Sequence, residues 1–195
     1  MARPTCYRCL RPEVGCVCER ITPVDNRTRV VIVQHPRERR HPFGTVRLAR
    51  LGLGNAEVHV ATRGDDDAAR CPPCAPPGAV LLYPGNPATP LSELTQTPSA
   101  LVVVDGTWPS SRGLLRANAW LRALPRVCLT PSSPGRYRIR KAPRPGVQLS
   151  TIEAIVEALR ILEPGTRGLV ELRDAFDGMI DHQIALRARL GRPLA

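Results

Sequence analysis

Short runs of apolar residues constrain the fold of this chain more than any other feature of its sequence. Residues 79–83 (AVLLY) and 101–104 (LVVV) are uninterrupted runs, and residues 29–34 (RVVIVQ) hold four apolar side chains in a row. Such runs are typical of strands that are buried on both faces, as in a parallel sheet covered by helices. Residues 56–60 and 126–129 are weaker candidates for further strands.

Helical patterns separate these runs. They cover about 44–51, 109–124, 150–162 and 168–190. The third has the clearest ends, because Ser150 and Glu153 form an S-x-x-E capping box and Pro164-Gly165 follows its last turn. Buried strands that alternate with helices predict an α/β fold, with helices on both faces of one sheet.

Positive charge is concentrated in two segments. The chain of 195 residues has a net charge of +11, and residues 106–152 hold nine basic residues and no acidic one. Residues 27–50 are also basic, with Glu38 as their one acid. A GC-rich genome explains the choice of arginine over lysine, but it does not explain this clustering. A field of one sign suits a polyanion such as nucleic acid, and a merely soluble surface is the alternative.

Four cysteines lie within the first twenty residues, in the pattern C-x2-C-x6-C-x-C. In a reducing compartment such thiols bind a metal more readily than they form disulfides, and four sulfur ligands suit a tetrahedral, structural zinc. So short a segment has no room for an apolar core, so the metal is expected to drive its folding. We therefore predict a zinc-binding segment, residues 1–20, and one larger domain, residues 21–195. The predicted ligands are Cys6, Cys9, Cys16 and Cys18.

The other cysteines give weaker signals. Cys71 and Cys74 form a lone C-x-x-C in a proline-rich loop, where a second metal, a disulfide and unpaired thiols are all open, and unpaired thiols are favoured. Cys128 lies in a strand-like run and is expected in the core. No apolar run is long enough for a membrane span or a signal peptide, so a cytoplasmic protein is expected.

Two predicted strands end in turns that suit a ligand. Asp105 follows the run 101–104 and begins the turn Asp105–Trp108, and Tyr83-Pro84-Gly85 follows the run 79–83. In α/β sheets, ligands bind beyond the carboxyl ends of the strands, and glycine lets backbone approach a bound molecule closely. A turn that only caps the helix beginning near Pro109 is the alternative, and the two roles are compatible.

Two basic segments offer candidate contacts for a polyanion. His35 and His41 lie among arginines without convincing metal-ligand partners, so loop structuring or phosphate contact is expected of them. Residues 136–146 (RYRIRKAPRPG) predict an extended segment that alternates basic and aromatic or apolar side chains, which suits phosphate contact and base stacking. A solvated edge strand is the alternative. The candidate contacts for RNA or a ligand carboxylate are His35, His41, Arg47, Arg112, Tyr137, Arg138, Arg140 and Lys141.

These motifs occur together, and in the same order, in one known family. The chain resembles the DTW-domain proteins, which are tRNA-uridine aminocarboxypropyltransferases related to the SPOUT superfamily. The matching stretches are CYRCLRPEVGCVC, QHPRERRHPFGTVRLARL, LLYPG, VVVDGTWPSSR and YRIRKAPRPGVQLSTIEAI, which span residues 6 to about 160. The loop with Cys71 and Cys74 is not a feature of that family.

The resemblance implies a fold and a reaction. It implies a SPOUT-like sheet with a C-terminal trefoil knot, and transfer of the 3-amino-3-carboxypropyl group of S-adenosylmethionine to N3 of a uridine in tRNA, with release of methylthioadenosine. It places Asp105, Thr107 and Trp108 in the catalytic centre. The predicted cofactor-binding residues are Tyr83, Pro84, Gly85, Leu149, Ser150 and Thr151.

The role of each site residue stays open at this point. Asp105 is either a general base or an acceptor that orients the uracil N–H, and Trp108 either stacks on a base or packs the turn. Arg138 or Arg140 is expected to pair with the cofactor's carboxylate. A SPOUT-type RNA methyltransferase and a non-catalytic zinc-ribbon RNA-binding protein are the alternative functions. The oligomeric state is open, with a monomer favoured.

Overall fold

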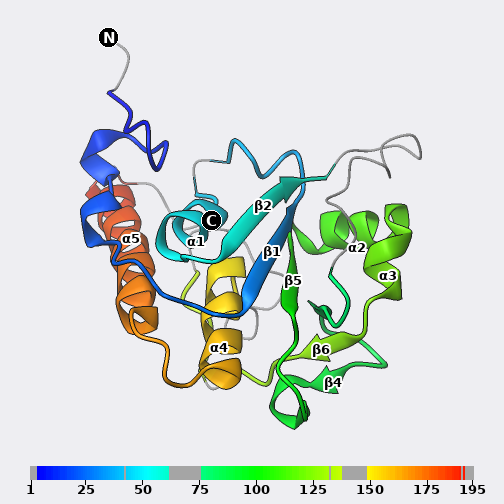
Figure 1. Ribbon diagram of the computed structural model, residues 1–195. Helices are drawn as coiled ribbons and strands as arrows, with labels where there is room; N and C mark the ends of the chain where they lie inside the picture. Colours follow the sequence, from blue (N-terminus) through cyan, green and yellow to red (C-terminus); the bar gives the residue numbers. More distant parts are fainter. Residues whose placement is uncertain are drawn as a thin grey trace.

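The computed structural model describes residues 4–41, 43–61, 76–131, 133–137, 149–189 and 191. A parallel sheet of six strands forms its centre, in the order β2-β1-β5-β3-β6-β4 (Figure 1). The sheet confirms the α/β class predicted from the apolar runs. Its strands are β1 (Arg29–Gln34), β2 (Ala56–Val60), β3 (Val80–Leu82), β4 (Thr89–Pro90), β5 (Ala100–Asp105) and β6 (Arg126–Cys128).

Helices cover both faces of this sheet. On one face lie α1 (Val46–Gly52), α4 (Thr151–Leu162) and α5 (Leu169–Arg189), and on the other lie α2 (Trp108–Ala117) and α3 (Ala119–Ala123) (Figure 1). Successive side chains of a strand point to opposite faces, so each strand supplies two cores. In β1, Val30 and Ile32 pack with α1, α4 and α5, whereas Val31 and Val33 pack with α2 and α3. This burial on both faces explains why the strands read as continuous apolar runs.

The helix boundaries follow local signals in the sequence. Ser150 caps α4 in a complete capping box with Glu153, as the S-x-x-E pattern predicts. The single helix predicted over 109–124 is wrong, because the chain breaks at Asn118 into α2 and α3. The Asn118 side chain donates a hydrogen bond of 2.8 Å to the carbonyl of Leu114, and its own φ of −119° and ψ of 101° are extended. Asparagine competes in this way with the helix for backbone partners.

The cysteine-rich segment packs against the end of the chain's last helix. It contains two short 3₁₀ helices, η1 (Glu13–Gly15) and η2 (Cys18–Arg20), which lie beside α5 (Figure 1). Between them Val17 is 4% exposed and belongs to the same core as α4 and α5. The segment therefore shares buried surface with the larger domain. No helix in the described part of the chain is long and apolar enough to cross a membrane.

Candidate active site and metal centre

Three neighbouring strands end at the same edge of the sheet, and each leads into a segment that the sequence marks. β5 lies between β1 and β3, and Gln34 at the end of β1 is in register with Asp105 at the end of β5. After β1 the chain enters α1 on one face, and after β5 it enters α2 on the other face (Figure 1). Such a reversal at the carboxyl ends of parallel strands is the usual place for a ligand in an α/β sheet.

Asp105 is held from two sides at this position. Its side chain is only 7% exposed; its Oδ2 accepts a hydrogen bond of 3.0 Å from the Gln34 amide, and its Oδ1 accepts one of 2.6 Å from the Thr151 hydroxyl. The Asp105 backbone carbonyl also accepts from the N–H of His35. The carboxylate thus joins the ends of β1 and β5 to the first residue of α4. Sequence reasoning missed Gln34, because nothing in the sequence shows that β1 and β5 are neighbours.

The turn after Asp105 is tight and begins a helix. Thr107 is the N-cap of α2, and its side chain accepts from the N–H of Ser110 at 3.3 Å. A Cβ on Gly106 would lie 3.2 Å from the Cβ of Ser110, so a larger residue here would press on the first turn of α2. Trp108 opens the helix and lies edge-on to the ring of Tyr83, with the ring centroids 6.0 Å apart. The structure therefore brings the turn after β3 and the turn after β5 together.

Two arginines act on Tyr83 of this aromatic pair. Burial raises the pKa of Tyr83, and the positive charges of Arg112 and Arg126 act in the opposite direction. A Cβ on Gly85 would lie 3.4 Å from the Nη1 of Arg126. Arg112 was predicted as a contact for RNA or a ligand carboxylate. Arg126 was not predicted, because Arg126 stands at the start of a strand and only its long side chain reaches the site. The two guanidinium groups give this edge of the sheet a positive field next to two aromatic rings.

Glu153 ties both ends of the arginine-rich segment to the start of α4. Its carboxylate is fully buried and accepts hydrogen bonds of 2.7 Å from the N–H of Arg136 and from the N–H of Ser150. The segment between them, residues 138–148, lies outside the described residues, and so do the predicted contacts Arg138, Arg140 and Lys141. Leu149, Ser150 and Thr151 lead into α4 beside Asp105.

Several predicted contacts have a clear structural role. His35 is buried, and its Nδ1 accepts from the N–H of Arg37, while the Nδ1 of His41 accepts from the N–H of Phe43. Both histidines therefore structure their loop, which was one of the two roles expected of them. The Tyr137 hydroxyl donates to the carbonyl of Phe43 over 2.7 Å, and its ring stacks on Phe176. That ring anchors the base of the arginine-rich segment to the core.

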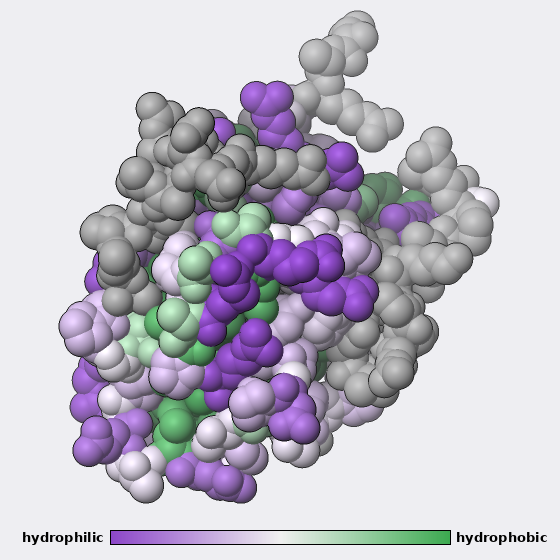
Figure 2. All heavy atoms as spheres, turned by 90° about the vertical axis from the view of Figure 1, so that its right-hand side faces the viewer, coloured by the Kyte–Doolittle hydropathy of each residue, from purple (hydrophilic) through white to green (hydrophobic). Residues whose placement is uncertain are grey.

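Exposed arginines continue from this site over α2 and α3. Figure 2 faces the side of the molecule where these helices lie, and hydrophilic side chains run across the middle of that face. The exposed basic residues of the two helices are Arg112, Arg116 and Arg122.

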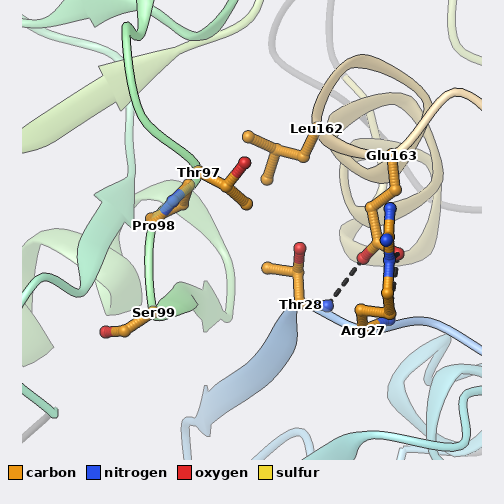
Figure 3. Close-up of a pocket in the computed structure, with 7 residues that line it drawn as sticks. All are labelled: Arg27, Thr28, Thr97, Pro98, Ser99, Leu162 and Glu163. Atoms are coloured by element: carbon orange, nitrogen blue, oxygen red, sulfur yellow. Dashed lines mark hydrogen bonds and ion pairs between the residues drawn. The ribbon is translucent and has the colours of Figure 1, made fainter.

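A pocket of about 310 Å³ lies at the opposite edge of the sheet, beyond the start of β1 (Figure 3). Glu163, just after α4, is 2% exposed there and accepts from the N–H groups of Arg27 and Thr28 at 2.9 and 2.7 Å. Burial acts to raise the pKa of Glu163, but these two hydrogen bonds and that of Thr166 hold it below its usual value. Glu163 thus fastens the end of α4 to the start of β1, and the pocket is separate from the edge that holds Asp105.

The four N-terminal cysteines form a cluster that fits a metal ion. Their sulfur atoms all lie within 4.8 Å of one another, with 3.7 Å between Cys6 and Cys18 and 3.8 Å between Cys9 and Cys16. Four sulfurs at about 2.3 Å from a tetrahedral zinc would be about 3.8 Å apart. Backbone N–H groups of Cys9 and Arg8 lower the pKa of Cys6 to about 6, whereas burial raises that of Cys18 to about 12. A divalent cation would relieve the repulsion that keeps the four thiols from ionising together.

Comparisons with known proteins give one matching family and several relatives. The DTW domain family matches residues 3–184. The tRNA-uridine aminocarboxypropyltransferase 2 of Mus musculus is 34% identical over 171 residues, which cover 83% of this chain and 57% of the mouse protein. The protein of that name in Drosophila melanogaster is 33% identical over 172 residues, which cover 83% of this chain and 67% of the fly protein. The chain thus spans little more than half of the mouse relative. No solved structure matches.

Proposed function

Because this chain belongs to the DTW domain family, we propose that it is a tRNA-uridine aminocarboxypropyltransferase. It would transfer the 3-amino-3-carboxypropyl group of S-adenosylmethionine to N3 of a uridine in tRNA and release methylthioadenosine. Two relatives with that name are 33–34% identical to it over most of its length. The observation that carries the proposal is the meeting of Asp105, Trp108, Tyr83 and Thr151 at the carboxyl edge of the sheet.

The residues at this edge fit the proposed cofactor. The rings of Tyr83 and Trp108 offer apolar surface for adenine, and the backbone at Gly85 and at the start of α4 offers close approach. Arg112 and Arg126 lie near Tyr83 and would pair with the cofactor's carboxylate. When bound, S-adenosylmethionine supplies an alkyl group already activated by its sulfonium, so the chain has to provide placement rather than an additional leaving-group activator.

We propose that Asp105 orients the uracil as a hydrogen-bond acceptor. Gln34 and Thr151 each donate to one of its oxygens and fix the direction of the carboxylate, so the role we assign to it is to orient the substrate. A carboxylate has about four lone-pair positions, so it can accept from a substrate N–H in addition to protein donors. In the reaction the N3–H bond breaks and an N3–C bond forms as the C–S bond breaks, and the proton passes to solvent.

The finer features implied by the resemblance belong to the same proposal. The tRNA would lie along the exposed arginines of α2 and α3 and the arginine-rich segment 138–148, with zinc in the segment 1–20. The domain 21–195 would have the SPOUT-like knot in its C-terminal half. The protein would act in the cytoplasm as a monomer.

Incubation of the purified protein with unmodified tRNA and S-adenosylmethionine tests this function. We expect methylthioadenosine as the small product and 3-(3-amino-3-carboxypropyl)uridine in the digested tRNA. Asp105→Asn should lower kcat by tenfold to about a hundredfold, the equivalent of about 1.5–3 kcal/mol for a hydrogen bond to a charged group. Ser99→Ala, at the opposite edge of the sheet, is the matched control. S-adenosylhomocysteine would instead identify a methyltransferase, and tRNA binding without either product would identify a non-catalytic RNA-binding protein.

A further inference from the structure

Arg11 lies buried beneath the cysteine cluster, and its charge is poorly satisfied. The residue is 2% exposed, and its Nε and Nη1 have no hydrogen-bond partner among the residues that the structure describes. Its Nη2 donates one long hydrogen bond of 3.4 Å to the carbonyl of Gly44. A guanidinium group that is out of water and lacks a charged partner destabilises the fold, so this position calls for a counter-charge.

The Cys9 sulfur is the candidate for that counter-charge. Cys9 is completely buried and lies two residues before Arg11 in the same turn, where the Arg11 carbonyl accepts from the N–H of Cys6. Burial lowers the pKa of Arg11, and the negative charge that Cys9 carries in a metal–thiolate cluster is the main effect that opposes this. Cys9 and Arg11 are thus two buried groups of one turn.

Arg47, in α1, brings a second positive charge to this region, because Arg11 donates to the carbonyl of Gly44 just before that helix. Burial lowers its pKa, and the charge of Cys9 is the effect that opposes it. Its Nη2 also donates to the carbonyl of Arg39 over 2.7 Å, in the basic loop between β1 and α1. The charge of one buried cysteine thus acts on two guanidinium groups, one from its own segment and one from the domain.

The charges of such a cluster balance. Four thiolates with one divalent cation carry a net charge of −2, and two guanidinium groups carry +2. We propose that Arg11 and Arg47 are the counter-charges of a metal–thiolate cluster at Cys6, Cys9, Cys16 and Cys18, so that the bound metal fastens the cysteine segment to α1 and the basic loop before it. The proposal does not depend on the transferase activity, because it concerns metal affinity and stability only.

This arrangement has a direct consequence for the protein without its metal. With the cation removed, nothing holds the four sulfur atoms in one fixed arrangement, while Arg11 keeps its charge in a buried place. Metal removal should therefore destabilise the wild-type protein in two ways. The segment loses its metal–sulfur bonds, and Arg11 loses its counter-charge. A variant with an apolar side chain at Arg11 would escape the second part of that loss.

Metal titration of the purified full chain tests the proposal. The zinc affinity of the wild type, Arg11→Met and Arg47→Met is measured by competition with a chromophoric chelator, and the cobalt(II) complex of each is recorded by absorption. We expect zinc affinity to fall about tenfold to a hundredfold in both variants, as for other groups that bond to metal ligands. The cobalt–thiolate absorption should keep its four-sulfur intensity. Arg8→Met and Arg50→Met, exposed on the same segment and on α1, are the matched controls and should keep the wild-type affinity.

Thermal unfolding with and without zinc gives the second readout. The wild type should lose more Tm than Arg11→Met when a chelator removes the metal. If Arg11→Met does not fold, Arg11→Lys keeps the charge without the planar fork, and its zinc affinity should lie between those of the wild type and Arg47→Met. Equal zinc affinity in Arg11→Met, Arg47→Met and Arg8→Met, with equal loss of Tm, would overturn the proposal.

Discussion

Replacing Thr151 with valine tests whether the start of α4 is tied to the end of β5. The Thr151 hydroxyl donates to Asp105 over 2.6 Å, and the Asp105 side chain is 7% exposed. Valine keeps the shape of the side chain, so the substitution removes little besides this hydrogen bond. A hydrogen bond to a charged group contributes about 1.5–3 kcal/mol. Because Thr151 is only half-buried, water can replace part of the lost hydrogen bond. We therefore expect the free energy of unfolding to fall by about 2 kcal/mol.

Urea denaturation measures this change directly. The midpoint should shift at constant m value, and Tm should fall by about 4–8 °C, at about 2–4 °C per kcal/mol for a domain of this size. A double-mutant cycle with Asp105→Asn should show a coupling energy of at least about 1 kcal/mol, since both changes act on one contact. Thr151→Ser keeps the hydroxyl and is the control. Additive effects, or a Thr151→Val protein as stable as the wild type, would refute the link between α4 and β5.

Three further predictions follow from other contacts. A carboxyl group whose pKa is lowered on folding stabilises the protein above its ordinary pKa of 4.5, and this stabilisation is lost as the pH falls through the folded-state pKa. The difference in unfolding free energy between the wild type and Glu163→Gln should therefore be full at neutral pH and shrink below pH 4.5 in acid unfolding curves. A difference that stays constant with pH would contradict this prediction. Gly168→Ala should lower the free energy of unfolding in urea by at least about 2 kcal/mol, because φ is +86° and the new Cβ would lie 2.9 Å from the Pro23 carbonyl oxygen. Gly165→Ala is the control and should be nearly neutral, because its new Cβ meets nothing within 4 Å. Arg126→Gln should weaken S-adenosylmethionine binding about tenfold or more by calorimetry, while exposed Arg116→Gln should not, and equal affinities would remove Arg126 from the site.

The helices and strands were predictable wherever burial produces a local pattern of apolar residues in the sequence. The bounds of β1 agree with the predicted run because both faces of that strand are covered, and α4 begins at its capping box because the cap is a local contact. The bounds of β2 also agree, although β2 is an edge strand and only partly buried. β4 was missed, since its two residues, Thr89 and Pro90, are too few to show a pattern. The break at Asn118 was also missed, because apolar spacing continues across it and the break depends on one side-chain hydrogen bond.

The site was predictable in its parts but not in its contacts. Asp105 and Tyr83 stand at strand ends, which the sequence shows, and a glycine marks each turn. The neighbours of Asp105 come from strand order, which is a tertiary property. Gln34 lies 71 residues before it and Thr151 lies 46 residues after it, and no local pattern links the three.

This dependence on strand order decides how activity data on Asp105 have to be interpreted. Asp105→Asn changes the group proposed to face the uracil and also weakens the junction of β1, β5 and α4, so a loss of kcat by itself does not separate chemistry from position. Thr151→Val weakens the same junction but keeps the carboxylate. If Asp105 acts on the substrate, the loss of kcat in Asp105→Asn will exceed that in Thr151→Val even at temperatures where both proteins are fully folded. If both variants lose the same amount, Asp105 serves the fold, and the acceptor for the uracil N–H has to be sought among other residues of this edge.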